Sequence, residues 1–128
     1  MTDAEEENVY ELVGGMQWFQ DLCDRFYRRV ANDPLLRPLY PEDLEPSRYW
    51  LAFFLAQYWG GPSDYSTQRG HPRLRMRHMH FPIGTRERDR WYEHMASALS
   101  EAQIDSEIEQ RMLDYFAMAA DHLINTAD

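Results

Sequence analysis

The chain has almost no cysteine and no long hydrophobic run. Cys23 is the one cysteine among 128 residues, so an internal disulfide and a metal cluster held by several cysteines are both excluded. No stretch approaches the roughly 18 consecutive apolar residues of a membrane-spanning helix, and the acidic segment 1–8 has no apolar run typical of a secretory signal. We therefore expect a cytoplasmic protein without stable membrane insertion.

Lysine is absent as well, because all 13 basic residues are arginine. They are outnumbered by 22 acidic residues, and the net charge of -9 argues against nucleic acid or an anionic membrane as a partner, since both require a positive field. The chain also lacks a glycine-rich phosphate loop, a Ser-His-Asp arrangement and paired carboxylates, so nothing favours a hydrolase or a phosphotransferase. One stretch departs from this acidic character. Between Asp64 and Glu87 there is no acidic residue but a cluster of arginines that suits a small anion: Arg69, Arg73, Arg75, Arg77 and Arg86.

Aromatic residues, in contrast, are abundant. They make up 14% of the chain within a hydrophobic fraction of 44%, which is enough for a packed interior. We expect residues 1–128 to form a single domain, with residues 1–8 as a flexible acidic N-terminus. So many flat side chains suit either an aromatic core or a pocket for a flat ligand, and composition leaves both open.

The spacing of apolar residues predicts an all-α fold. Apolar positions recur at intervals of three and four over residues 16–30, which indicates an amphipathic helix. A second helix is expected to begin near Pro46 and to end at Gly60-Gly61-Pro62, followed by a polar loop from Ser63 to Gly70. Two later helices are predicted from their N-terminal signals, which are Thr85 as an N-cap and a capping box of Ser106 with Glu109.

A short helix between Pro72 and Pro82 is predicted to carry His78 on an apolar face with Leu74 and Phe81. A lone histidine on such a face is usually a hydrogen-bonded core residue. The alternative role for His78 is that of a neutral imidazole that ligates iron. Three cations of the same segment could then pair with the carboxylates of haem: Arg73, Arg75 and Arg77.

The same segment offers a His-x-His pair, His78 with His80, and His71 is nearby. Such a set could bind zinc or another transition metal. On a helix, however, residues two apart point about 200° away from each other, so the two imidazoles would not converge on one ion. The spacing therefore disfavours this metal site.

Three polar aromatic residues have positions that allow them to face one interior. Tyr27 and Trp91 fall on the inward faces of their predicted helices, and Tyr40 lies in the turn before Pro41. Each also has an ordinary explanation as a core or loop residue. The residues by themselves thus indicate an all-helical domain that could hold a flat ligand.

Several longer motifs resemble those of the truncated haemoglobins, specifically group II. The resemblance covers about residues 9–125 and rests on these segments: Val13-Gly14-Gly15, Arg25-Phe26-Tyr27, Leu39-Tyr40-Pro41, Gln57-Tyr58-Trp59-Gly60-Gly61-Pro62, Gln68 to His78, and Arg88-Asp89-Arg90-Trp91. It implies a two-over-two helical sandwich around haem b and its iron.

The resemblance also implies roles for individual residues. His78 becomes the proximal iron ligand, and the distal residues that stabilise a bound ligand are Tyr27, Tyr40 and Trp91. Leu51 and Phe54 are expected to line the distal wall. The haem plane and its propionates would be held by Tyr65, Met76, Arg77 and Phe81.

The chain departs from the family pattern around Glu42 to Trp50, where loop length varies. Ser47 falls at the ligand gate, where group II relatives often have Ala or Gly. The hydroxyl of Ser47 and the bulk of Trp50 would narrow the entrance or add a hydrogen bond, so ligand access is not carried over from the family.

The predicted function is binding of O2, together with other diatomic ligands. Each distal hydrogen bond contributes about 1.5 kcal/mol, so two or three donors would slow O2 release by roughly 10² to 10³. The alternative is a haem redox enzyme, a peroxidase or nitric-oxide dioxygenase, which would need an external reductase because 128 residues leave no room for a reductase domain. A third reading is a haem-free helical interaction module, and the sequence leaves open whether the protein is a homodimer.

Overall fold

The computed structural model describes residues 8–70 and 81–126, and within these ranges it is helical, with no strand. This confirms the all-α prediction. The predicted short helix with His78, Met76 and Arg77 lies outside the described residues. The helices are α2 (Val9–Val13), α3 (Met16–Ala31), the 3-10 helix η1 (Arg37–Leu39), α4 (Glu45–Tyr58), α5 (Asp64–Arg69), α7 (Thr85–Ser100) and α8 (Ser106–His122).

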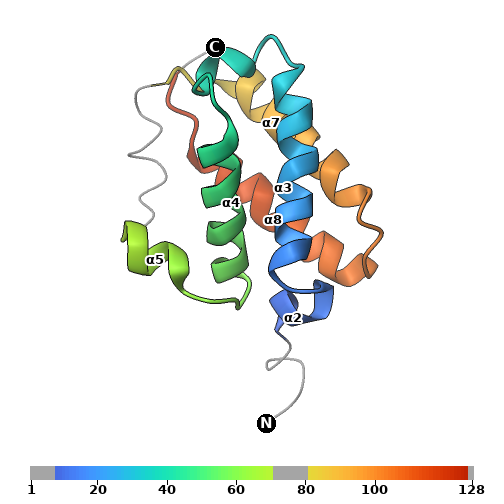
Figure 1. Cartoon of the computed structure of the whole chain (residues 1–128). Coiled ribbons are helices and arrows are strands. Elements are labelled where there is room, and N and C mark those ends of the chain that lie inside the picture. The colour runs from blue at the N-terminus through green and yellow to red at the C-terminus, as the bar shows by residue number, and fades with distance from the viewer. Residues whose placement is uncertain (1–7, 71–80, 127–128) are drawn as a thin grey trace.

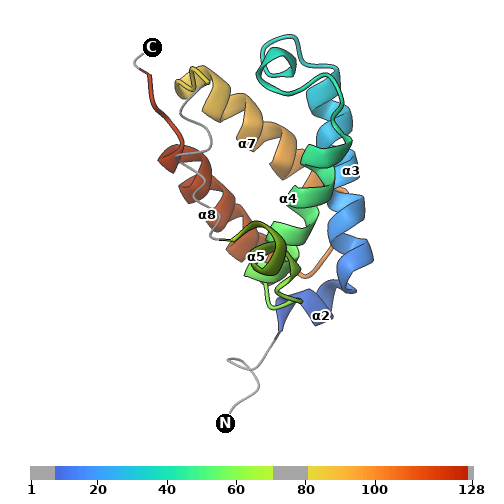
Figure 2. The same ribbon diagram turned by 60° about the vertical axis from the view of Figure 1, so that its left-hand side comes forward.

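The four long helices form two pairs (Figure 1). Helix α3 packs against α4 and α7, and α7 packs against α8. In the turned view, α3 and α4 lie on one side and α7 and α8 on the other, with α5 beside α4 (Figure 2). This arrangement is the predicted two-over-two sandwich. None of the helices in the described ranges is both long enough and apolar enough to span a membrane.

The core follows the apolar face predicted for residues 16–30. The side chains of α3 that point inward are fully buried, and they are Phe19, Leu22, Cys23, Phe26 and Val30. They meet Met95 and Leu99 of α7 and Met112 and Phe116 of α8 in one cluster. Burial raises the pKa of the Cys23 thiol, so this cysteine stays protonated and serves as a small core side chain.

The Gly60-Gly61 pair allows α2 to pack against the end of α4. Asn8 caps α2 and donates from its side chain to the Gly60 carbonyl at 2.9 Å, while the Tyr10 amide donates to the Trp59 carbonyl at 2.9 Å. A Cβ atom would come within 2.6 Å of Asn8 Nδ2 at Gly60, and within 2.6 Å of Tyr10 Cδ1 at Gly61. Glycine is therefore required here for close packing as well as for ending the helix.

The loop predicted from Ser63 to Gly70 is wrong, because it contains helix α5. Tertiary contacts explain the difference. Gln57 at the end of α4 bonds twice to Ser66, with Gln57 Nε2 donating to Ser66 Oγ at 2.7 Å and the Ser66 amide donating to Gln57 Oε1 at 3.0 Å. Tyr65 is buried against Phe54, with ring centroids 5.4 Å apart. These contacts stabilise a turn of helix that a polar sequence would not hold alone.

Two predicted helix caps are each wrong by one residue. Helix α7 begins at Thr85, so the cap position is Gly84, whose amide donates to Glu87 Oε1 at 2.9 Å. Helix α8 begins at Ser106, and Asp105 caps it by accepting from the amides of Glu107 and Ile108. Asp105 competes successfully with Ser106 because a carboxylate also interacts favourably with the helix dipole.

Candidate functional site

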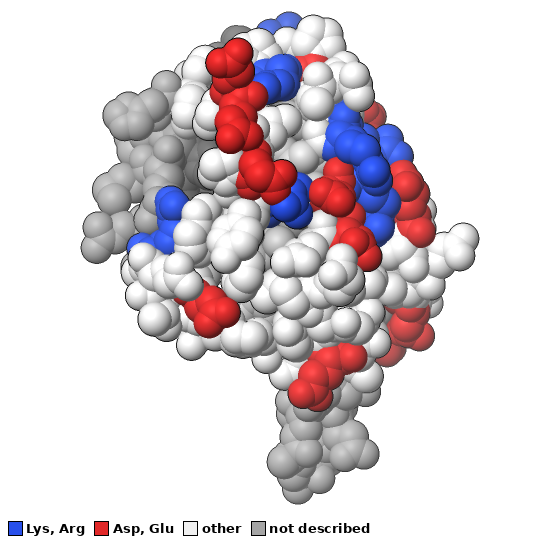
Figure 3. Space-filling view, in the orientation of Figure 1, with Lys and Arg blue, Asp and Glu red and all other residues white. Residues whose placement is uncertain are grey.

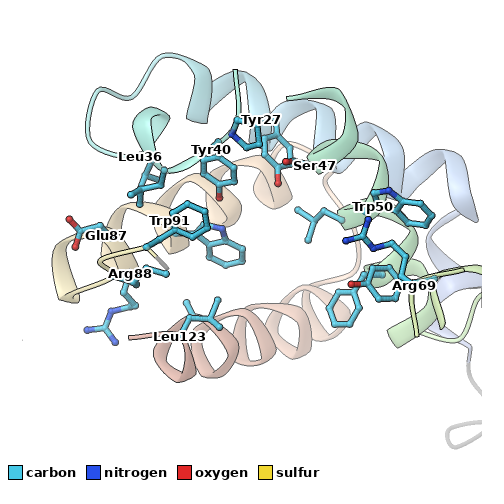
Figure 4. Close-up of a pocket in the computed structure, with 18 residues that line it drawn as sticks. Tyr27, Leu36, Tyr40, Ser47, Trp50, Arg69, Glu87, Arg88, Trp91 and Leu123 are labelled. Carbon is cyan, nitrogen blue, oxygen red and sulfur yellow. The ribbon is translucent and has the colours of Figure 1, made fainter. Parts of the chain in front are cut away.

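A cavity of about 360 Å³ lies between the two helix pairs (Figure 4). Its size is within the range of small-molecule and cofactor sites, and its walls are mainly aliphatic and aromatic. The sequence-predicted residues within the described ranges all line it: Tyr27, Tyr40, Ser47, Trp50, Leu51, Phe54, Tyr65, Phe81 and Trp91. The structure therefore brings together side chains that are up to 64 positions apart in the chain, from Tyr27 to Trp91.

Tyr27, Tyr40 and Trp91 meet at one side of this cavity (Figure 4). The rings of Tyr27 and Tyr40 stand perpendicular with centroids 5.6 Å apart. Burial raises the pKa of Tyr40 to about 12, and a hydrogen bond with the Trp91 side chain opposes this rise. Because an indole N–H can only donate, Trp91 is the donor and the Tyr40 oxygen accepts.

Both tyrosines are neutral at physiological pH. The pKa of Tyr27 is raised well above its usual value, first by burial and then by its neighbours Tyr40 and Cys23. A neutral phenol keeps its O–H and can donate a hydrogen bond. The cavity thus combines apolar walls with phenolic donors at one side.

Contacts around the cavity hold two of these side chains, Trp91 and Tyr40, in position. Trp91 on α7 packs edge to face against Phe26 of α3, with ring centroids 5.3 Å apart. Tyr40 follows η1, and the Arg37 guanidinium holds the turn after it by donating to the carbonyls of Pro41 and Glu42 at 2.9 and 2.6 Å. These contacts keep Trp91 and Tyr40 at the wall of the cavity.

Asp33, at the end of α3, anchors the chain segment that leads to Tyr40. Only 3% of Asp33 is exposed. Its carboxylate accepts hydrogen bonds from the Leu35 amide at 2.8 Å and from Arg90 Nε and Nη2 at 3.0 and 2.8 Å. It also lies 2.6 Å from His94 Nε2. Burial alone would raise its pKa, but the hydrogen bonds with His94, the Leu35 amide and Arg90 outweigh this effect and lower the pKa to about 2.

Sequence reasoning missed this group. Arg90 and His94 lie 57 and 61 positions from Asp33, so no local spacing connects them. The aspartate before a proline was the one available signal, because it is typical of a side chain that bonds its own turn.

The other end of the cavity is aromatic and bordered by a cation. The Trp50 and Tyr65 rings are perpendicular at 5.9 Å, and the Arg69 guanidinium lies 5.0 Å from the centre of the Trp50 ring. Arg69 is one member of the predicted cationic group, and Arg73, Arg75 and Arg77 lie outside the described residues. Phe81 reaches the cavity from the segment before α7, which Asn125 holds by donating to the Phe81 carbonyl at 2.9 Å.

These features fit a haem group. An apolar, aromatic slot between two helix pairs suits the flat porphyrin, and Arg69 at its edge suits a carboxylate. The phenolic donors at the Tyr27 side suit a small polar ligand rather than the porphyrin itself. The cavity also has lining residues that the sequence did not predict, namely Leu36, Leu39, Ile83, Ala120 and Leu123.

Comparisons with known proteins agree with this geometry. A model of the family described as bacterial-like globin matches residues 8–125. The chain is 37% identical to the group 2 truncated hemoglobin YjbI of Bacillus subtilis, over 93% of this chain and 89% of that protein. Among solved structures, it is 51% identical to a hemoglobin from the thermophilic phototrophic bacterium Chloroflexus aurantiacus, with a TM-score of 0.91 over 93% of this chain and 98% of the other.

Another solved structure is described as a truncated oxygen-avid haemoglobin from Bacillus subtilis. It is 38% identical, with a TM-score of 0.85 over 91% of this chain and 98% of that chain. The match of the family model across nearly the whole chain and the relatives of high coverage lead to the same assignment. The chain belongs to the bacterial-like globin family, and within it to the group 2 truncated haemoglobins, whose globin fold implies haem binding.

Proposed function

We propose that this protein binds haem b in the cavity between the helix pairs and holds O2 and other diatomic ligands there with slow release. The observation that carries the proposal is the meeting of Tyr27, Tyr40 and Trp91 at one side of an otherwise apolar cavity. The oxygen avidity named for the Bacillus subtilis relative supports it.

Haem would be held from both sides by residues of this chain. His78 is proposed as the proximal iron ligand, with Met76 and Arg77 next to the porphyrin and its propionates. Leu51, Phe54, Tyr65 and Phe81, all at the cavity, would contact the ring. Haem would supply an iron atom that the His78 imidazole holds and that can bind a diatomic ligand.

The distal residues act as a ready set of donors. Trp91 donates to the Tyr40 oxygen, so the O–H of Tyr40 can still donate a hydrogen bond to a ligand. The neutral phenol of Tyr27 lies next to it. A ligand that gains partial negative charge is stabilised by such donors, while the apolar walls exclude water that would compete for them. Each hydrogen bond of this type contributes about 1.5 kcal/mol, or about tenfold in the dissociation rate.

The test is the rate of O2 release. In the Tyr27→Phe, Trp91→Phe double variant we expect O2 to dissociate roughly 10² times faster than from the parent protein, because two donors worth about tenfold each are removed while an aromatic ring is kept at both positions. Stopped-flow displacement of O2 by CO measures this rate.

A matched control is Tyr49→Phe, which removes a phenol on α4 that is 41% exposed and does not line the cavity. Its dissociation rate should equal that of the parent. If the double variant released O2 as slowly as the parent, the distal role of these residues would be rejected.

A further inference from the structure

A second hollow, of about 440 Å³, lies on the outer side of α3 and α7. It is formed by the C-terminal part of α3, the turn after it and one face of α7: Arg25, Arg28, Arg29, Asn32, Asp33, Arg90, His94 and Glu101. Basic side chains gather over the C-terminal half of α3 in the space-filling view (Figure 3). Four arginines in one hollow stand out on a chain whose net charge is -9.

The carboxylates of the hollow neutralise only two of these arginines. Asp33 pairs with Arg90, and Glu101 pairs with Arg29 at 2.5 Å. With the imidazole counted as neutral, four arginines against two carboxylates leave a net charge of +2. Within the part of the chain that the structure describes, Arg25 and Arg28 have no carboxylate in an ion pair with them.

The two remaining cations converge on the same place. The pKa of Glu101 is lowered first by its hydrogen bond with Arg29, and further by the charges of Arg25 and Arg28, which line the same hollow. The hollow therefore concentrates positive charge instead of distributing it along a solvated helix face.

Arg25 is also fixed in position and has an unused donor. Its Nε donates to the Ala98 carbonyl of α7 at 2.9 Å, which ties the guanidinium to the wall of the hollow. Its Nη2 atom is buried and has no hydrogen-bond partner among the described residues. A buried guanidinium N–H without an acceptor is unfavourable, and a shift of the side chain toward the hollow would let an oxygen of a bound anion accept from it.

From this geometry we propose that the hollow on α3 and α7 binds a phosphate-type oxyanion, either a free phosphate or the phosphate group of a small metabolite. Planar guanidinium groups match the oxygens of phosphate, which makes this class a better fit than a halide or a single carboxylate. Among the described residues, the lining contains no Phe, Tyr or Trp side chain on which a nucleic-acid base could stack. This site is separate from the ligand cavity and does not depend on the function proposed for it.

The test is calorimetric titration of the haem-loaded protein with pyrophosphate at pH 7 and low salt. We expect saturable binding with a dissociation constant of about 1 mM or lower, weakened at least about tenfold in Arg28→Gln and in Arg25→Gln. Arg28 is exposed, and its side chain makes no hydrogen bond or ion pair among the described residues, so this variant keeps the fold. The matched control is Arg111→Gln on the exposed face of α8, which should bind like the parent.

Two further titrations identify the kind of ligand. Inorganic phosphate and a phosphomonoester such as glycerol phosphate should compete with pyrophosphate, and the stronger competitor distinguishes a free ion from a metabolite. The proposal is overturned if pyrophosphate does not bind, if Arg111→Gln weakens binding as much as Arg28→Gln, or if a hexaglutamate peptide binds more tightly than pyrophosphate. The absorption band of the haem, recorded on the same samples, reports separately on the proposed cofactor.

Discussion

Asp33 is the buried charged residue of the described chain, and it joins two helices at one carboxylate. It accepts hydrogen bonds from Arg90 and lies within hydrogen-bond distance of His94, both on α7, while its other contact, with the Leu35 amide, begins the segment that leads to Tyr40. A buried carboxylate with several donors is stable only as long as it stays ionised.

This chemistry predicts how stability depends on acid. Because the pKa of Asp33 is lowered to about 2 in the folded protein, its contribution is fully present above the pKa of an unfolded aspartate, about 4, and is lost as the pH falls from about 4 to 2. At pH 7, Asp33→Asn should therefore lower the free energy of unfolding by on the order of 1–2 kcal/mol, after allowing for the solvent around Arg90.

Urea denaturation followed by circular dichroism at several pH values measures this effect. The difference between the variant and the parent should shrink as the pH approaches 2. Asp114→Asn, on the exposed face of α8, is the control and should leave the acid dependence as in the parent. A difference that stayed constant from pH 7 to pH 3 would mean that Asp33 contributes by packing alone.

At the level of elements, the contact between α2 and the end of α4 depends on Gly61. The backbone of Gly61 is not in the left-handed region, so the need for glycine here comes from close packing alone. A methyl group at Gly61 would meet Tyr10 Cδ1 at 2.6 Å and the Ala56 carbonyl oxygen at 2.9 Å. Tyr10 in turn stacks on Phe19 of α3, with ring centroids 6.0 Å apart, so it cannot move without disturbing the core.

We therefore expect Gly61→Ala to destabilise the protein by about 1–3 kcal/mol, since overpacking forces a shift of α2. For a domain of this size, that loss corresponds to a decrease in Tm of roughly 4–12 °C. Thermal unfolding by circular dichroism provides the measurement. Gly70→Ala is the comparison, because Gly70 has a φ of 76° but no atom of the described residues within 4 Å of an added Cβ. A smaller loss in Gly61→Ala than in Gly70→Ala would contradict the packing argument.

The elements also show how far sequence reasoning extends. Helix α3 was predicted because six of its buried residues recur at intervals that only a helix aligns on one face. Helix α5 was missed because its stability comes from Gln57 and the burial of Tyr65, both of which depend on tertiary structure. Many of the residues that line the cavity were predicted from motifs of the family. Leu36 and Leu123 also line it, but only the folded structure shows this.

At the scale of the whole molecule, the cavity lies between the two helix pairs. Its lining includes residues from α3, α4, α5, α7 and α8, as well as from the segments between them. A cofactor in this cavity would contact both helix pairs at once. Its apolar contacts would take the place of the side-chain packing that the cavity interrupts. Folding stability and cofactor binding should therefore be coupled.

Removal of the cofactor tests this coupling. We expect the haem-loaded protein to show a strong Soret band and a Tm clearly above that of the apoprotein, because a ligand that binds only the folded state stabilises it in proportion to its affinity. In His78→Ala the band should be lost or displaced, and added imidazole should restore it. His122→Ala, at the end of α8, is the matched control and should keep the spectrum of the parent. An unchanged spectrum in His78→Ala would place the iron ligand elsewhere.

The Asp33 anchor has one more consequence, for how the protein could be tuned. The polypeptide that carries Tyr40 is positioned from behind, by a carboxylate and two α7 side chains that face the outer surface and do not line the ligand cavity. Substitutions of Asp33, Arg90 or His94 would therefore change the affinity for a small ligand indirectly, through the position of Tyr40, while every residue that lines the ligand cavity stays the same.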